Sequence, residues 1–248
     1  MSTLRSSSSL HRAADTVIGA VVGVTISLLL PASRLLDGRQ TLNRLATGLH
    51  DALMAMSDGL RHDWSPDQTE EWRDRAREVR SRMVGAAAEA IGNSRESIRW
   101  NLRDRGHIDE LVRYEAVLTT FERAAIGVSV IARGIDDHAR LSGTAHAAMP
   151  SIGELLEALA VAVDRLAATV IGGAADTEFV TALDEVRRRR QRCVEAASRR
   201  AREALLADVD QDADPDEEQR RRLDGEWLNY AAILVQVDRI VADLDTDA

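Results

Sequence analysis

The sequence predicts an all-α protein in which one N-terminal transmembrane helix precedes an antiparallel bundle of long amphipathic helices. Its 248 residues include only 2 Phe, 4 Trp, 2 Tyr, 15 Gly and 4 Pro, which are residue types that build sheets and tight turns. Apolar residues recur at alternating spacings of three and four, as one face of a packed helix requires. A long run near the N-terminus carries no charge and is typical of a membrane span.

The N-terminal part divides into a polar segment, residues 1–11, and the predicted transmembrane helix, residues 12–33. Residues 16–33 contain no charged side chain, and 18 helical residues span about 27 Å, close to the hydrocarbon thickness of a bilayer. Pro31 limits the strongly apolar part to residues 17–30. A buried helix of a soluble protein and the core of a cleaved signal peptide therefore stay open as alternatives.

Four residues of this segment predict contacts inside or beside the membrane. Gly19 and Gly23 form a G-x-x-x-G pair, which lets a neighbouring membrane helix, or a copy of this one, approach closely. Asp15 would lie at the edge of the hydrocarbon layer, where a carboxylate needs water or a cation. Arg12 is three residues earlier on the same helix face and supplies such a cation.

The pattern R-x-x-D-T-x-x-G, formed by Arg12, Asp15, Thr16 and Gly19, opens an apolar run that ends in Leu-Leu-Leu-Pro31. In this stretch the sequence resembles the last transmembrane helix of the fusaric acid resistance and aromatic acid exporter superfamily. The resemblance implies a six-helix membrane unit in the inner membrane, a helical cytosolic region after it, and export of small organic acids. The family places five further membrane helices before this motif.

A single helix encloses no path for a solute, so this chain alone is not expected to transport anything. We expect residues 34–248 to form a cytosolic assembly or regulatory domain, and a small organic acid to bind only in a complete assembly with other membrane helices. The alternative is a stand-alone scaffold, single-pass or peripheral, whose bundle binds a partner protein. A soluble helical enzyme is a third interpretation.

The remaining chain predicts seven helices separated by capping residues, glycines and prolines. Ser65 before Pro66, Ser151, and Asp214 before Pro215 each resemble a helix start, because a capping side chain stands three residues before Gln or Glu. The pair Gly92-Asn93 predicts a helix end. The expected helices are 33–63, 66–91, 94–105, 108–140, 151–171, 176–207 and 216–245.

Each long helix carries an apolar seam with a mean spacing of 3.5 residues, which favours bundle packing. The predicted core positions are Leu42, Leu45, Leu49, Met56 and Leu60; Leu111, Tyr114, Leu118, Phe121, Ala125, Val128 and Ala132; Ile152, Leu156, Leu159, Val163, Leu166 and Val170; and Leu223, Trp227, Tyr230, Leu234, Val237, Val241 and Leu244.

Charge is organised in blocks. The net charge is −9 and every cation is an arginine, which argues against a nucleic-acid binder. Residues 187–202 are rich in arginine, and the acidic linker 208–218 follows. We interpret the two blocks as solvated or mutually neutralising, with anionic lipid as a weaker alternative. The linker lacks the Gly and Glu that a calcium loop needs, having Ala213 and Gln219 at those positions.

Signals of catalysis are absent from the sequence. It has no Walker loop, no G-x-S-x-G and no H-E-x-x-H spacing, so neither an enzyme nor a cofactor or metal site is predicted. Cys193 is expected to be a buried thiol on an apolar face. The pair His62-Asp63 and the run Asp136-Asp137-His138 are interpreted as solvent-exposed faces of helices.

Overall fold

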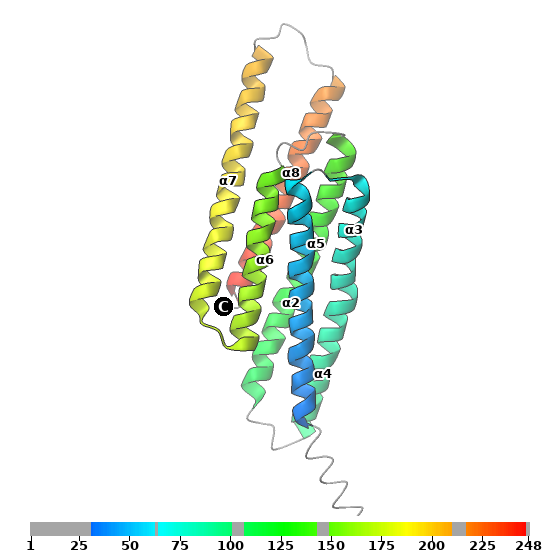
Figure 1. Cartoon of the computed structure of the whole chain (residues 1–248), viewed down its shortest axis with the longest axis vertical. Helices are drawn as coiled ribbons and strands as arrows, with labels where there is room; N and C mark the ends of the chain where they lie inside the picture. The colour runs from blue at the N-terminus through cyan, green and yellow to red at the C-terminus, as the bar shows by residue number, and fades with distance from the viewer. Residues whose placement is uncertain (1–30, 63, 101–106, 143–148, 210–216, 247–248) are drawn as a thin grey trace, which may run out of the picture.

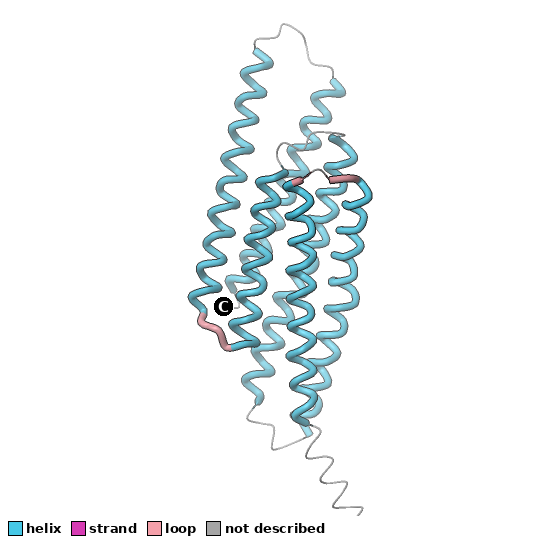
Figure 2. Tube along the Cα trace, in the orientation of Figure 1, coloured by secondary structure: helices cyan, strands magenta, loops and turns pink. Residues whose placement is uncertain are grey.

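The computed structural model describes residues 31–62, 64–100, 107–142, 149–209 and 217–246. Its regular elements in these ranges are all helical (Figures 1 and 2), which confirms the all-α bundle. They are α2 Pro31–Arg61, α3 Pro66–Glu78, the π-helix η1 Val79–Met83, α4 Val84–Trp100, α5 Ile108–Ser142, α6 Met149–Gly172, α7 Asp176–Val209 and α8 Glu217–Thr246.

The predicted transmembrane helix, residues 12–33, lies outside the described residues except for its last three, which open α2. The polar segment 1–11 lies outside them as well. Among the described helices, none combines the length and the apolar character needed to cross a bilayer.

The segments α3, η1 and α4 form one continuous rod, and this rod and the other long helices run antiparallel to the helix that precedes them, with α2 at the centre of the packing (Figure 1). It makes its most extensive contacts with α6 and also packs against α3, η1, α4 and α5. The two last helices cover the outside, with α7 mainly on α6 and α8 mainly on α5. Both extend beyond the other helices at the upper end of the molecule (Figure 1).

The apolar seams form the core as predicted. Leu42, Leu45, Leu49, Met56 and Leu60 of α2 are at most 2% exposed. The predicted positions of α5 and α6 are likewise buried, apart from Leu118 and Val170, which are partly buried against the core. On α8 the seam is buried at Tyr230, Leu234, Val237 and Leu244 and partly buried at Val241, whereas the side chains of Leu223 and Trp227 lie outside the described part.

The predicted break at Gly92-Asn93 is wrong, because one continuous helical rod runs from Pro66 to Trp100. A Cβ at Gly92 would meet nothing within 4 Å, so this glycine only lowers helix propensity on an exposed face. A glycine inside a helix costs about 1 kcal/mol. Burial of Ile91, directly before Gly92, and of Ile98, further along the same helix, outweighs this cost.

The irregularity of this rod lies close to its middle, in η1. The N–H of Val84 donates to the carbonyl of Val79, five residues earlier, instead of four as in an α-helix. Met83 from the same turn lies against α2 at Gly48, where a Cβ would come within 2.4 Å of the methionine sulfur. The absence of a side chain at Gly48 therefore permits the close approach of η1 to α2.

Two of the predicted helix boundaries can be compared with capping contacts. Ser65 caps α3 in a reciprocal capping box with Gln68, as predicted. The predicted start at Ser151 is wrong, because α6 begins two residues earlier at Met149. Met149 is fully buried, and Pro150 fits the first turn, where its missing N–H has no partner to lose.

The acidic linker is shorter than the predicted 208–218. Helix α7 continues to Val209 and α8 begins at Glu217, so both ends of the predicted linker are helical. Residues 210–216, which include Asp214 and Pro215, lie outside the described part. Helices tolerate such acids because differences in helix propensity among these residue types are small.

Candidate functional site

The residues predicted to act at the membrane are mostly not described. Arg12, Asp15, Thr16, Gly19 and Gly23 all lie outside the described residues, so their proximity stays a prediction. Pro31, the last residue of the motif segment, is the first residue of α2. Its place there agrees with the preference of proline for the first turn of a helix.

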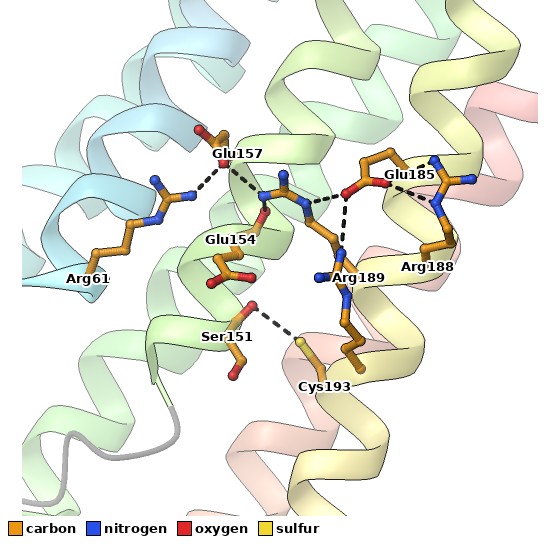
Figure 3. A network of polar contacts seen from close by, with 9 residues as sticks. Arg61, Ser151, Glu154, Glu157, Glu185, Arg188, Arg189 and Cys193 are labelled. Atoms are coloured by element: carbon orange, nitrogen blue, oxygen red, sulfur yellow. Dashed lines mark hydrogen bonds and ion pairs between the residues drawn. The ribbon is translucent and has the colours of Figure 1, made fainter.

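The most extended polar cluster in the described residues joins α2, α6 and α7 (Figure 3). Glu157 of α6 accepts hydrogen bonds from Arg61 of α2 and from Arg189 of α7, the latter at 2.8 Å. Arg189 also donates from Nη1 to the carbonyl of Glu154 at 2.8 Å and from Nε to Glu185 at 2.7 Å. One guanidinium therefore connects the backbone and a carboxylate of α6 to its own helix.

The carboxylates of Glu157 and Glu185 are held in their charged form by these arginines. The hydrogen bonds from Arg61 and Arg189 lower the pKa of Glu157, and those from Arg189 and Arg188 lower the pKa of Glu185. Ionised acceptors make the stronger class of hydrogen bond. The side chains of Glu157 and Glu185 are about one third exposed, so each pair contributes modestly and the network acts as a unit.

Further arginines of the predicted block pair with acids of α7 and α8. Arg187 contacts Asp245 at 2.9 Å and Arg190 contacts Asp238 at 2.7 Å, which ties α7 to α8. Arg192 contacts Glu185 at 3.2 Å. The sequence predicted that the arginine block is solvated or neutralised by the acidic linker. The side chains of that linker lie outside the described part, and the partners found in the described residues come from the bundle itself.

Cys193 is buried as predicted, with 1% of its surface exposed. Its thiol donates to the carbonyl of Ser151 at 3.3 Å, and its own carbonyl accepts from the hydroxyl of Tyr230 at 3.2 Å. Burial raises the pKa of the Cys193 thiol, which disfavours the nucleophilic thiolate. Cys193 therefore lies where α7 contacts both α6 and α8.

A second polar cluster corrects the prediction that Asp136 and His138 lie on an exposed face, since they are only 3% and 4% exposed. Asp136 accepts hydrogen bonds from Thr69 at 2.7 Å, Arg73 at 2.8 Å and Arg140 at 3.2 Å. Burial alone would raise the pKa of Asp136, but the hydrogen bonds from Thr69 and Arg140 and the two guanidinium charges lower it below its usual value. The cluster joins α3 to α5.

The position of Asp136 was readable from the periodicity. Asp136 lies four residues after Ala132, the last predicted core position of α5, and so continues the apolar seam. Ile135, three residues after Ala132, is also buried. The neighbouring acid Asp137 is exposed, as the same helical period requires. A buried aspartate on a seam indicates partners on a facing helix, and that signal was missed.

A third pair, His50 of α2 and Asp164 of α6, lies at a partly exposed position. Nδ1 of the histidine is 2.9 Å from the aspartate and 3.3 Å from the carbonyl of Ala160. Burial raises the pKa of Asp164, and the nearby charge of Asp51 adds to that effect. This pair adds a further polar contact between α2 and α6.

The open spaces between helices are shallow. A groove of about 540 Å³ runs between α2 and the α3–η1 segment, and one of about 640 Å³ runs between α6 and α7. Within the described part of the chain, no three His, Cys, Asp or Glu residues are placed to hold a metal ion. The clusters described above connect helices to one another.

The comparisons with known proteins add no relative. No family model matches the chain, no curated protein matches it, and no solved structure matches it. What can be inferred about function therefore comes from the sequence motif and from the geometry of the bundle.

Proposed function

We propose that this chain is a membrane-anchored component of an organic acid efflux system. Residues 12–33 would form its membrane helix, and residues 34–248 a cytosolic assembly domain at the inner membrane. The proposal is supported by the order of features along the chain: the R-x-x-D-T-x-x-G motif, the apolar run, and then directly α2, which starts at Pro31.

The role of α2 makes this order significant. It is the helix against which α3, η1, α4, α5 and α6 all pack, so the proposed membrane segment would precede the helix at the core of the bundle directly in the sequence. The ion pairs from Arg61 to Glu157 and from Arg189 to Glu157 continue the connection from α2 through α6 to α7. Such a rigid, centrally connected bundle suits assembly or regulation.

The transport path itself must come from elsewhere in the assembly. One helix about 10 Å across has no lumen, so further membrane helices are required, and copies of this chain or another polypeptide would supply them. A small organic acid would bind only in that assembly.

The test is the apparent mass of the native polypeptide in carbonate-washed membranes, detected with an antibody against residues 34–248. A retained band far above 27.2 kDa supports a tail fused to the membrane unit, and a retained band at 27.2 kDa co-purifying with a multi-helix membrane protein supports a separate subunit. A chain that leaves the membrane in carbonate contradicts the anchor.

The second candidate is a stand-alone scaffold that binds a protein partner. It is favoured by the projection of α7 and α8 beyond the other helices (Figure 1), which presents two helix ends away from the core. A retained band at 27.2 kDa without any co-purifying membrane protein would favour this candidate over the efflux component.

A further inference from the structure

One end of the bundle exposes large apolar side chains. At this end α2 begins, α4 ends and α5 begins, opposite the end at which α7 and α8 project (Figure 1). Leu36 is 54% exposed, Ile108 44% and Val112 56%. We call this end, made of residues 36–39, 95–99 and 107–113, the basal end. Exposure of several large apolar residues in one region indicates an interaction surface.

The three helices are fixed to one another just above the basal end. A Cβ at Gly38 of α2 would lie 3.4 Å from the hydroxyl of Ser94 in α4, so these two helices are in close contact. Arg95 of α4 pairs with Glu115 of α5 at 3.5 Å. The apolar side chains are therefore presented on a rigid surface rather than on independent helix ends.

Arginines accompany the apolar residues. Arg39, Arg99 and Arg113 are exposed, and within the described residues none of them has an ion-pair partner. The arginines at 187–190 and 192, in contrast, are all paired inside the bundle. The basal end and the turn above it also carry the acids Asp37, Glu96, Asp109, Glu110 and Glu115. Its charges nearly balance, so net positive charge cannot drive binding there.

We propose that the basal end contacts the lipid surface of the membrane directly, so that the bundle stands upright on the bilayer. Leu36, Ile108 and Val112 enter the headgroup region, and the exposed guanidinium groups of Arg39, Arg99 and Arg113 bind lipid phosphates, for which arginine has the matching geometry. The proposal rests on the anchoring of residues 12–33 proposed above.

The position of the uncharged run identifies the bilayer as the occupant. This run ends at Ser33, three residues or about 4.5 Å of helix before Leu36. The headgroup region is about 5–8 Å thick on each side of the hydrocarbon core. Leu36 therefore falls at headgroup depth when residues 16–33 span the membrane, and the end of α4 and the start of α5 lie at the same end of the bundle (Figure 1).

The test measures how close each end of the bundle lies to lipid. The full chain carrying Cys193→Ala is reconstituted into phosphatidylcholine vesicles, with a fluorophore on Val112→Cys. Glu70→Cys, an exposed position at the start of α3, carries the fluorophore in the control protein. Lipids with a nitroxide headgroup should quench position 112 several-fold more strongly than position 70. Equal quenching at the two positions overturns the proposal.

A matched pair of variants tests the apolar contacts. Replacement of Leu36, Ile108 and Val112 by serine, with the label moved to Arg113→Cys, should lower the quenching at least two-fold. The control replaces three other exposed apolar residues by serine, Ile126, Val130 and Val235, and should leave quenching unchanged. Equal effects of both sets overturn the proposal.

Retention in carbonate-washed vesicles separates this proposal from the proposed function. Retained protein with equal quenching at both ends contradicts the upright contact but keeps the anchor. Protein that is extracted by carbonate yet quenched at position 112 before extraction contradicts the anchor and supports the contact. Extraction combined with equal quenching contradicts both.

Discussion

Replacement of Asp136 by alanine should destabilise the bundle by about 2–4 kcal/mol. The buried hydroxyl of Thr69 loses its hydrogen bond to the carboxylate at 2.7 Å, and a hydrogen bond to a charged group contributes about 1.5–3 kcal/mol. Arg73 and Arg140 lose a carboxylate at 2.8 and 3.2 Å. Their side chains are 30% and 66% exposed, so water replaces much of that interaction and the two together add about 1 kcal/mol.

The assay is thermal unfolding of the full chain in non-ionic detergent, followed by far-UV circular dichroism. For a chain of this size the expected loss lowers Tm by about 5–15 °C. Asp136→Asn keeps an oxygen that accepts from Thr69 and should lose about half as much. The control is Asp137→Ala, because Asp137 is exposed and its replacement should change stability by less than about 0.5 kcal/mol.

The pH dependence of the stability of the same proteins tests the role of Asp136 independently. Because the folded-state pKa of Asp136 is lowered, the stabilisation is fully present above the unfolded value of about 3.9 and is lost as the pH falls through the folded value. The alanine variant lacks this component, so its difference from the unmodified protein should shrink on acidification. An Asp136→Ala protein as stable as Asp137→Ala would refute the reasoning.

Three further predictions concern helix contacts. Gly59→Ala should destabilise the protein by about 1–3 kcal/mol, because the added Cβ would come within 2.1 Å of the Trp72 ring. Gly85→Ala should instead stabilise it by about 0.5–1 kcal/mol, because a Cβ at Gly85 would meet nothing within 4 Å. Urea unfolding measures the stability of both variants. Glu157→Gln weakens its pairs with α2 and α7, so it should cost about 1–2 kcal/mol at low salt and less at high salt. A cost independent of salt would show that the pairs are not electrostatic. Deletion of Ser81, an exposed residue of η1, should preserve the fold and change stability by about 1 kcal/mol or less, as measured by Tm.

The bundle was predictable because its seams have one dominant period. Leu42, Leu45 and Leu49 are buried as alternating spacings require, and Ser65 caps α3 through a contact between residues three apart. Both features are local in sequence. Predictions from local signals were wrong where packing opposed them, as at Ser151, which became interior to α6 because Met149 and the residues after it bury an apolar face.

The polar clusters were not predictable in the same way, because their partners are distant in sequence. Arg61 and Glu157 are 96 residues apart, and Thr69 and Asp136 are 67 apart. Periodicity places each residue on a face of its own helix, but which face it meets depends on the order of helices around α2. The arginine block illustrates this limit. Its composition predicted that its positive charge is solvated or neutralised by nearby acids, but only the fold identifies partners such as Asp238 and Asp245.

The π-helix shows how one inserted residue is accommodated along a long helix. The buried positions of α3 and α4 are three or four residues apart except for one step of five, from Val79 to Val84. In a regular α-helix that extra residue would rotate the following face by about 100°, away from α2. The π turn absorbs it, so that Trp72 before the turn meets α2 at Gly59 and Ser94 after the turn meets α2 at Gly38.

This account explains why deletion within η1 should be tolerated. Without Ser81, the spacing between the buried residues Val79 and Val84 becomes four. An ordinary α-helix then turns the buried faces of both α3 and α4 toward α2. Glu89 is also an exposed residue, in α4. Its deletion leaves η1 in place and rotates the rest of α4 about the helix axis, which moves Ile91 and Ile98 out of the core. It should therefore cost several times more stability, on the order of two large core residues or about 3–6 kcal/mol. If the two deletions lower the stability equally, η1 does not determine which face of α4 meets α2. The π-helix must then follow from some contact other than the shared packing of α3 and α4 against α2.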